Sequence, residues 1–462
     1  MNNIAIIGAG PSALFAAKTI LESSQNLIVH IYERGNAPGN RICPMQTSCC
    51  KMCTYCNIIN GGGGSGLFSD GKLILDLVSG GKAQGINGLP LEEQEAITST
   101  IKKTFERFDG VSESMEVPSI EEQAIYNNIL EQNDLKIKYY SVMHMGTSNL
   151  YRITQNFINY LADTFENRVK FNFKTNVTNV IKKADGEYLL VTNQGSESYL
   201  AVVAAVGKAG ANWLKMILQK FQCSYLTHDY FFGVRLETQS HNIENLLKFS
   251  FDPKIYRMVN ERKVKLHCVC RNGDIRFYNY NGILSVGGHS PYTKNNLKFS
   301  QMDRANFNVM LSFDKTKVPP NDLLAKLNCI SGQRILAQRL GDFIANRKTD
   351  TWGQLVPKNE EMICIENIRN IMDFIDCEFS DILIDFINSL SRLSVGIADP
   401  DNIIYAPAIE WDMDTVEVDN HMETSQRNIF AVGDGAGISQ GIVYSSATGI
   451  IAGREIVLRY GV

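Results

Sequence analysis

The feature that most constrains the fold is a glycine motif near the amino terminus, set between an apolar segment and an amphipathic one. Residues 4–7 (IAII) form a short apolar run typical of a buried parallel strand. Residues 8–13 (GAGPSA) follow directly and match the pattern G-x-G-x-x-A. Residues 13–21 then have the pattern of a helix, and residues 27–32 (LIVHIY) that of a second strand, which ends at Glu33. This order predicts a βαβ unit that binds a dinucleotide.

Each position of the motif suits contact with a diphosphate. Gly8 permits a tight turn out of the strand, and Gly10 lets the backbone approach the phosphates closely. Ala13 keeps the helix near the sheet, and the amino end of that helix offers free N–H groups and a positive dipole. The residues predicted to contact the diphosphate are Gly8, Gly10, Pro11, Ser12 and Ala13. A glycine-rich turn without a ligand is the alternative interpretation.

An acidic residue closes the second predicted strand. Glu33 lies 25 residues after Gly8 and can accept hydrogen bonds from the hydroxyl groups of an adenosine ribose. A carboxylate at this position disfavours a 2′-phosphate, which argues against NADP as the ligand of this site. Arg34 and Arg41 follow in the adjoining loop and are further candidates for contact with the cofactor.

The carboxyl-terminal part of the chain repeats the order of a strand, a glycine turn and a helix. Residues 428–432 (NIFAV) predict a strand, residues 433–437 (GDGAG) a turn, and residues 444–460 a helix. At this point the chain resembles the large family of FAD-binding oxidoreductases with a single Rossmann domain. In that family, a strand that ends in G-D near the carboxyl terminus returns to the FAD site.

This resemblance adds Gly433, Asp434, Gly441 and Ile442 to the residues expected to bind the cofactor. Asp434, after Gly433, is expected to hydrogen-bond the ribityl and pyrophosphate region of FAD. The backbone around Gly441 and Ile442 is expected to point the amino end of the last helix at the flavin pyrimidine ring. A helix amino terminus there stabilises negative charge on a reduced flavin.

An internal segment completes the predicted FAD site. Residues 169–173 (VKFNF) and 175–177 (TNV) look like the strand and turn whose backbone meets adenine, which makes Val177 a candidate contact. Residues 200–206 predict an apolar strand that ends at Gly207. Related flavoproteins carry A-T-G there, and this chain reads A-V-G, so the threonine hydroxyl is absent. We find no second G-x-G-x-x-G after a strand, which predicts that a separate NAD(P)H domain is missing.

A glycine-rich run, residues 61–73 (GGGGSGLFSDGKL), follows a cysteine-rich loop. A stretch like GGAG-x-FSDGKL preceded by C-x-x-C resembles the group named uncharacterised FAD-dependent dehydrogenases, as do residues 233–237, 252–254 and 338–343. The resemblance implies fold and cofactor but no reaction. By topology the loop, residues 41–72, crosses near the flavin. Backbone N–H groups at Gly64 and Ser65 are then candidates for bonds to the flavin edge, and Lys72 for a nearby positive charge. A flexible surface loop is the alternative.

Four cysteines of the loop are candidate metal ligands. Cys50, Cys53 and Cys56 form C-x2-C-x2-C, and Cys43 lies seven residues before Cys50. Four thiolates could hold an iron–sulfur cluster or zinc. Cys53 and Cys56 could instead form a disulfide that exchanges electrons with the flavin. Reduced cysteines without a role are the third interpretation, and the spacing leaves all three open.

The predicted fold class is α/β, with a Rossmann-type FAD-binding domain and an inserted substrate domain built on a mixed or antiparallel sheet. Residues 215–400 carry short strand patterns at 231–236, 265–270, 275–280 and 283–286, with hairpin signals at 272–273 and 281–282 and helices at 323–327, 333–345 and 368–390. The predicted domains are an FAD-binding part at 1–79, a helical insertion at 80–140, FAD-binding residues 141–214, the substrate domain at 215–400 and a final FAD-binding part at 401–462.

A dehydrogenase needs a base near the atom that loses hydride. His144 lies just before the second predicted FAD segment, His289 follows Gly287 and Gly288, and Tyr444 follows the start of the last predicted helix, so all three are candidates. Histidine has a suitable pKa for this role. Glu410 is a weaker candidate. Each of these side chains is also compatible with a purely structural, hydrogen-bonded role.

Composition narrows the class of partner. The formal net charge is −4, and no basic run of the kind that binds nucleic acid is present. No apolar run approaches the ~20 residues that span a bilayer, and the amino terminus lacks a secretory pattern. We therefore expect a soluble, cytoplasmic protein with a small-molecule substrate; the oligomeric state is not indicated.

Three functions fit these features. The first is an FAD-dependent dehydrogenase or oxidase, in which hydride passes from the substrate to flavin N5. The second is a flavin monooxygenase or reductase that takes electrons from external NAD(P)H. The third is a non-catalytic FAD-binding redox sensor.

Overall fold

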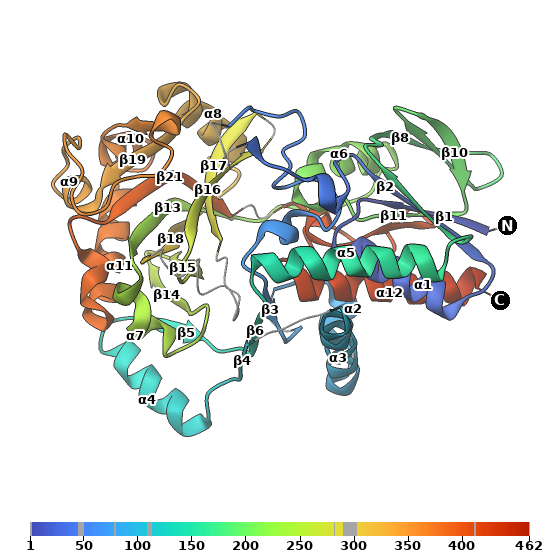
Figure 1. Cartoon of the computed structure of the whole chain (residues 1–462), viewed down its shortest axis with the longest axis horizontal. Coiled ribbons are helices and arrows are strands. Elements are labelled where there is room, and N and C mark those ends of the chain that lie inside the picture. The colour runs from blue at the N-terminus through green and yellow to red at the C-terminus, as the bar shows by residue number, and fades with distance from the viewer. Residues whose placement is uncertain are drawn as a thin grey trace.

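The computed structural model describes residues 2–44, 50–77, 80–108, 113–280, 282–289, 303–410 and 413–461. Figure 1 shows two lobes side by side. One lobe contains a parallel sheet flanked by long helices, and both chain termini lie at its outer end. The other lobe is built around a large sheet with helices on its outer side.

The first lobe is organised by a parallel sheet of five strands, in the order β23-β11-β1-β2-β7. Their bounds are β1 Asn2–Ile7, β2 Leu27–Glu33, β7 Val169–Phe173, β11 Ala201–Ala204 and β23 Ile429–Ala431. The strands predicted from the two glycine motifs and from the internal segment are therefore neighbours in one sheet. This arrangement confirms the predicted α/β fold class.

Helices α1 (Pro11–Ser23) and α12 (Ile442–Tyr460) pack closely against each other beside this sheet. The contact depends on small residues, because a Cβ added to Gly449 would lie 2.1 Å from the backbone oxygen of Ser12. The amino-terminal and carboxyl-terminal glycine motifs are thereby brought to the same end of the sheet.

Two smaller sheets complete the first lobe. The strands β8 (Val177–Lys182), β9 (Tyr188–Thr192) and β10 (Gly195–Tyr199) form an antiparallel meander between β7 and β11. The strands β3 (Lys72–Ile74), β6 (Val142–His144) and β4 (Glu113–Met115) form a short sheet near the junction of the lobes.

The large sheet of the second lobe has eight strands in the order β20-β19-β21-β13-β18-β15-β14-β5. Their bounds are β5 Lys136–Lys138, β13 Tyr230–Gln239, β14 Lys254–Val259, β15 Arg262–Cys270, β18 Arg304–Phe313, β19 Ile335–Arg339, β20 Ile363–Ile365 and β21 Ile403–Glu410. Pairing is antiparallel except between β19 and β20, so the sheet is mixed as expected. The hairpin of β16 (Asp274–Tyr280) and β17 (Ile283–His289) and the pair of β12 (Tyr225–Leu226) and β22 (Thr415–Val416) are separate.

The remaining helices cover the sheets and the junction. They are α2 Gln84–Asn87, α3 Leu91–Arg107, α4 Ile120–Glu131, α5 Thr147–Thr164, α6 Gly207–Lys220, α7 Glu244–Leu247, α8 Pro320–Ile330, α9 Leu340–Ile344, α10 Ile368–Ile375 and α11 Phe379–Leu393. Within the described ranges, a helix long and apolar enough to cross a membrane is absent.

Three local predictions need correction. The segment predicted as one helix at 333–345 begins with strand β19, because its apolar residues fill a buried position beside β21. The turn at residues 272–273 does not join a hairpin, since β15 pairs with β14 and β18 and β16 pairs with β17. The predicted helix at 368–390 is interrupted between α10 and α11.

The domain boundaries also shift. β21 belongs to the large sheet, so the lobe built on that sheet extends as far as Glu410, past the boundary at residue 400 that was expected for the substrate domain. The segment 80–140 is not a separate insertion, because β5 pairs with β14 and Leu130 of α4 is buried in the core of the large lobe. Its other helix, α3, buries Ile97 and Ile101 in the core of the first lobe.

Candidate functional site

A cavity of about 450 Å³ lies where the carboxyl ends of β1 and β2 face the hairpin β16–β17. β2 and β11 flank β1 on opposite sides, so the strand order reverses next to this cavity. Such switch points at the carboxyl ends of parallel strands are the usual ligand sites of open α/β sheets. Eight residues predicted to bind the cofactor line the cavity: Gly8, Gly10, Glu33, Arg34, Gly64, Ser65, Val177 and Gly207.

Gly8 forms the turn that leads from β1 into the cavity wall. Its N–H donates to the Tyr32 backbone oxygen at 2.7 Å, and its φ is +108°. A Cβ at this position would lie 2.2 Å from the Ala205 backbone oxygen. Glycine is therefore required here by the fold itself, whether or not a ligand binds.

Gly10 is different, because the protein leaves room for a side chain there. A Cβ added to Gly10 would meet only the Cα of Gly64, at 3.8 Å. The described side chains leave the amino end of α1 uncapped, with Gly10 as N-cap and Pro11 as the first helical residue. The space beside Gly10, next to free helix N–H groups, therefore suits an anionic group that approaches the backbone.

Glu33 holds the cavity wall together. Its carboxylate accepts hydrogen bonds from three backbone N–H groups, those of Ala9 at 3.1 Å, Gly35 at 2.8 Å and Gly61 at 3.0 Å. A carboxylate offers about four acceptor positions, so one position is left for a ligand hydroxyl. Glu33 lines the cavity, as predicted, and it also serves as a structural anchor of the glycine run.

The two predicted arginines have different surroundings. Arg34 lines the cavity and donates to the Asn60 side-chain oxygen and the Ala209 backbone oxygen, both at 2.8 Å. Arg41 lies beneath the glycine run, where its guanidinium donates to backbone oxygens, among them Gly62 at 2.8 Å and Gly64 at 2.7 Å. Burial lowers the pKa of Arg41 to about 10, which still leaves it cationic at neutral pH. Arg41 therefore supports the conformation of the glycine run through these hydrogen bonds and does not line the cavity.

The predicted carboxyl-terminal residues lie behind the wall as well. A Cβ on Gly433 would lie 2.6 Å from the Ser12 hydroxyl oxygen, so Gly433 and Ser12 pack closely. The Asp434 carboxylate accepts hydrogen bonds from two serine hydroxyls, Ser439 at 2.8 Å and Ser445 at 2.7 Å. Ile442 contacts the glycine run, because a Cβ on Gly66 would lie 3.4 Å from its Cγ1. Gly441 is the N-cap of α12, with φ +97°.

The proton-transfer candidates are scattered. Tyr444 is 2 % exposed and points away from the cavity: its hydroxyl accepts from the Ala83 N–H and donates to the Asn87 side-chain oxygen. Burial raises its pKa to about 12, so it is a poor base at neutral pH. His144 pairs with Lys72 across strands β6 and β3, outside the cavity wall. His289 ends β17, opposite Asp274.

Lys72 and Glu410 are both engaged in buried ion pairs. Lys72 lies 2.7 Å from the Asp70 carboxylate and also donates to the Val269 backbone oxygen. Glu410 pairs with Lys265. Burial would raise the pKa of Glu410, but His267 and Lys265 lower it below its usual range, so Glu410 remains ionised and is a weak base.

Within the described ranges, the four candidate cysteines do not appear in a group of three possible metal ligands. Cys43 lines the cavity, and Cys53 and Cys56 are not joined by a disulfide bond. Among the described residues, the one group of three possible metal ligands is elsewhere, at Asp70, Cys268 and Cys270. A metal at Cys43, Cys50, Cys53 and Cys56 thus gains no support from the arrangement of these residues. Cys49 lies outside the described residues.

The cavity wall opposite the parallel sheet comes from residues that the sequence did not single out. Arg276, Tyr278 and Tyr280 of β16 line the cavity, and Lys208 in the first turn of α6 lines it as well. A signal was available, because alternate residues of a strand share one face and these three occupy alternate positions. The sequence did not fix the register of the predicted hairpin, so it did not show which face of this strand points inward.

Comparison with known proteins gives a weak similarity to solved structures, one of which contains FAD. Glycine oxidase from Geobacillus kaustophilus has a TM-score of 0.43 and 11% identity, covering 99% of this chain and 95% of that one. For 2,6-dihydroxypyridine-3-hydroxylase from Arthrobacter nicotinovorans the values are 0.42 and 9%, covering 99% and 83%. CtdE in complex with FAD and a substrate gives 0.39 and 8%, covering 99% and 80%.

With scores and identities this low, the functions of those proteins are not transferred to this chain. No family model matches the sequence, and no curated protein matches it.

Proposed function

We propose that the cavity binds FAD and that the chain is an FAD-dependent oxidoreductase acting on a small molecule. The observation that carries the proposal is the cradle beside Gly10, where the protein has room for a side chain but has none. This cradle lies at the uncapped amino end of α1, within a wall that also carries Glu33. A diphosphate beside Gly10 and a ribose at Glu33 would use both features.

The remaining wall fits the other parts of the cofactor. Val177 and the adjoining turn would contact adenine, and Gly64 and Ser65 would lie toward the flavin. Arg34, Lys208 and Arg276 bring positive charge to the wall, which favours an anionic ligand. When bound, FAD supplies a centre that accepts two electrons as hydride.

The direct test is flavin binding by the purified full-length chain. We expect absorbance bands near ~370 and ~450 nm, the usual flavin positions, or their appearance when FAD is added to colourless protein. Gly10→Ala should fold normally, because the added methyl group meets only a 3.8 Å contact, yet bind FAD at least about tenfold more weakly.

The matched control is Gly39→Ala. Gly39 is exposed and outside the wall, and its added Cβ would lie 3.5 Å from the Tyr151 hydroxyl oxygen, an ordinary contact. This variant should bind FAD like the parent chain. Colourless protein that takes up no FAD, or equal affinity in Gly10→Ala and the parent, would contradict the proposal.

We further propose the direction of the chemistry: hydride passes from a substrate seated against β16 to the flavin. The support is the polar inner face of β16, where Arg276 and Tyr278 can orient a substrate. A spectrum recorded without oxygen decides between this proposal and a reductase or monooxygenase. Rapid bleaching of the flavin by NADH or NADPH alone would favour the latter.

A further inference from the structure

A pair of cysteines on β15 is placed for chemistry that the FAD site does not use. The Sγ atoms of Cys268 and Cys270 lie 4.0 Å apart. In a regular strand, residues two apart in sequence are separated by about 6.6 Å along the strand axis, so regular geometry does not bring the two sulfur atoms together. Here the register between β15 and β18 shifts between His267 and Cys270, and Cys268 has a φ of +54°. This bulge draws the two thiols together, at a conformation that is strained for a residue other than glycine.

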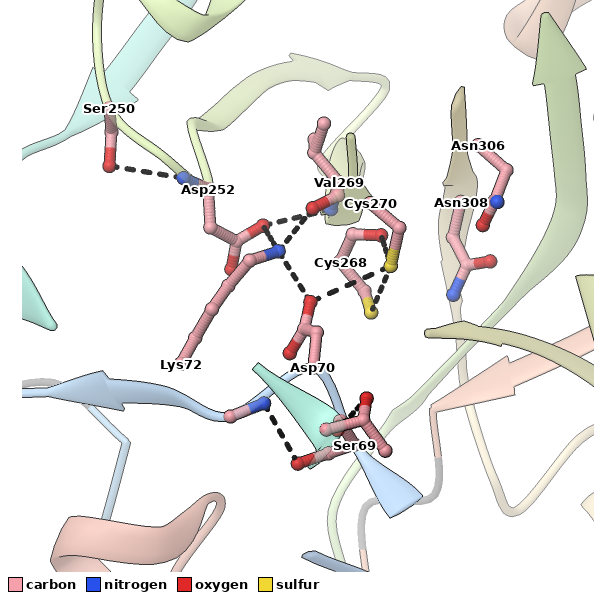
Figure 2. Close-up of polar contacts among 12 residues, drawn as sticks. Ser69, Asp70, Lys72, Ser250, Asp252, Cys268, Val269, Cys270, Asn306 and Asn308 are labelled. Carbon is pink, nitrogen blue, oxygen red and sulfur yellow. Dashed lines mark hydrogen bonds and ion pairs between the residues drawn. The ribbon is translucent and has the colours of Figure 1, made fainter. Parts of the chain in front are cut away.

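The thiols are surrounded by fixed charges from distant segments (Figure 2). Arg235, which is 1% exposed, donates to the Cys270 sulfur at 3.3 Å and to the Cys268 backbone oxygen at 3.2 Å. Asp70 lies 3.5 Å from the Cys270 sulfur and 2.7 Å from the Lys72 ammonium. Charge on one sulfur is therefore compensated by buried groups, as reactive thiolates require.

The charge balance favours one thiolate. Lys72 also lies 3.7 Å from Asp252, and Asp252 pairs in turn with Lys254. With Arg235, the cluster has three cations against the two carboxylates of Asp70 and Asp252. One thiolate makes the set neutral, whereas a second would bring an excess negative charge beside Asp70.

The two cysteines differ in access. Cys268 is partly exposed, while Cys270 is fully buried. The hydrogen bond with Cys270 lowers the pKa of Cys268 below its usual value, against burial and with help from Arg235. The same interaction and burial raise the pKa of Cys270. Cys268 is thus the thiolate that an incoming reactant meets, and Cys270 the protonated thiol behind it.

These surroundings argue against a metal. The possible ligand atoms of Asp70, Cys268 and Cys270 lie within 4.8 Å of one another, which is a spacing that metals use. Arg235, however, already donates a hydrogen bond to the Cys270 sulfur, and Lys72 already pairs with the Asp70 carboxylate. Both groups that a metal cation would need are therefore engaged. A divalent ion there would face two buried positive charges at contact distance.

The dithiol lies one layer of side chains behind the cavity wall. Gly288 lines the cavity, and a Cβ added to it would lie 2.1 Å from the Arg235 guanidinium. Tyr278, another residue of the wall, interacts electrostatically with both Arg235 and Cys268. The site is therefore adjacent to the cavity and distinct from it.

We propose that Cys268 and Cys270 form a redox-active dithiol that is oxidised to an intramolecular disulfide by disulfides of small thiols. The Cys268 thiolate attacks one sulfur of the incoming disulfide and releases one thiolate. The Cys270 thiol then loses its proton and attacks the Cys268 sulfur of the mixed disulfide, which releases the second thiolate. Two protein thiols are oxidised, and one external disulfide is reduced to two thiols. This proposal does not depend on FAD.

The test equilibrates the reduced full-length chain with mixtures of glutathione and glutathione disulfide, blocks the remaining thiols by alkylation and measures peptide masses. We expect the peptide spanning both cysteines to lose two hydrogens and carry no alkyl group in oxidising mixtures, and the reverse in reducing ones. In Cys270→Ser, which lacks the resolving thiol, one glutathione should remain on Cys268. In Cys268→Ser, adduct formation at Cys270 should be at least about tenfold slower, because that thiol is buried.

Cys329→Ser is the matched control, since Cys329 is exposed on α8 and far from the pair in sequence. It should behave like the parent at residues 268 and 270, and circular dichroism should show that all variants are folded. Absence of the disulfide in mixtures that oxidise the urea-unfolded chain would overturn the proposal. Tight, stoichiometric Zn²⁺ binding that protects both thiols from alkylation would also overturn it. Neither outcome bears on FAD binding.

Discussion

The Glu33 carboxylate accepts a hydrogen bond of 3.0 Å from the Gly61 N–H, across 28 residues of chain. The same carboxylate accepts from the Ala9 N–H, so one side chain ties the glycine run to the turn after β1. Gly63 reinforces the connection by donating to the Ala9 backbone oxygen at 2.8 Å. The shape of the cavity wall therefore depends on a buried charge as well as on glycine.

Replacing Glu33 by Gln should weaken this wall. Glutamine keeps the size of the side chain but turns one acceptor into a donor, which then faces backbone N–H groups. One buried donor left unsatisfied costs about 1–3 kcal/mol. We expect a loss of that size in the free energy of unfolding by urea, together with weaker FAD binding. Glu93→Gln, at an exposed pair with Arg454, should change neither quantity by more than about 1 kcal/mol.

Gly8→Ala should destabilise the chain with or without cofactor. The added Cβ would lie 2.2 Å from the Ala205 backbone oxygen, at a φ of +108°. The unfavourable backbone conformation costs roughly 1–2 kcal/mol and the overlap about 1–3 kcal/mol more. Thermal unfolding without FAD measures the sum. In Gly186→Ala the φ is +89° but the Cβ meets nothing within 4 Å, so only the backbone cost should appear. Equal losses of stability in Gly8→Ala and Gly186→Ala would show that the overlap with the Ala205 backbone adds no cost.

Tyr444→Phe should lower stability without affecting the cavity. The change removes the acceptor of the Ala83 N–H, which is 3.1 Å from the hydroxyl oxygen. We expect a loss of about 1–3 kcal/mol in the free energy of unfolding, because a buried donor is left unsatisfied. FAD affinity, measured by titration at a temperature where the variant is folded, should stay within about twofold of the parent. A large loss of affinity would restore Tyr444 as a site residue.

Alkylation of Cys268 by iodoacetamide should depend on pH in an unusual range. Its pKa is lowered by the hydrogen bond with Cys270, so the thiolate fraction should rise at a lower pH than in an ordinary thiol. In the urea-unfolded chain, thiols should titrate near about 8.5. Cys270→Ala removes the main cause of the shift and should move the midpoint toward the unfolded value. Arg235, Asp70, Lys72 and His144 also face this cluster, and they should set any remaining shift.

The parallel sheet was predictable because its signals are local. The turn at Gly8, the helix that starts at Pro11 and the strand that ends at Glu33 are adjacent in sequence, and short-range patterns identify such units. For the large sheet, the sequence predicted a mixed or antiparallel sheet but not the order of its strands. Its strand β19 has helix-like spacing, and pairing with β21 overrides that local preference.

The dithiol illustrates what sequence patterns miss. Cys268 and Cys270 are two residues apart, and isolated C-x-C pairs carry no geometric information. Asp70, 200 residues from Cys270, and Arg235 give the pair its electrostatic setting. A single sequence does not reveal such long-range contacts, and its strongest cysteine pattern is the denser cluster at residues 43–56.

The strands of the large sheet come from widely separated parts of the chain. In sequence, β5 lies between β2 and β7 of the parallel sheet, and among the strands β22 alone separates β21 from β23. Among the described strands, no single cut of the polypeptide would leave both sheets complete. Recombination at one junction therefore cannot exchange the lobe built on the large sheet for another. Such an exchange would need junctions on both sides of β5 as well as on both sides of the segment from β13 to β21.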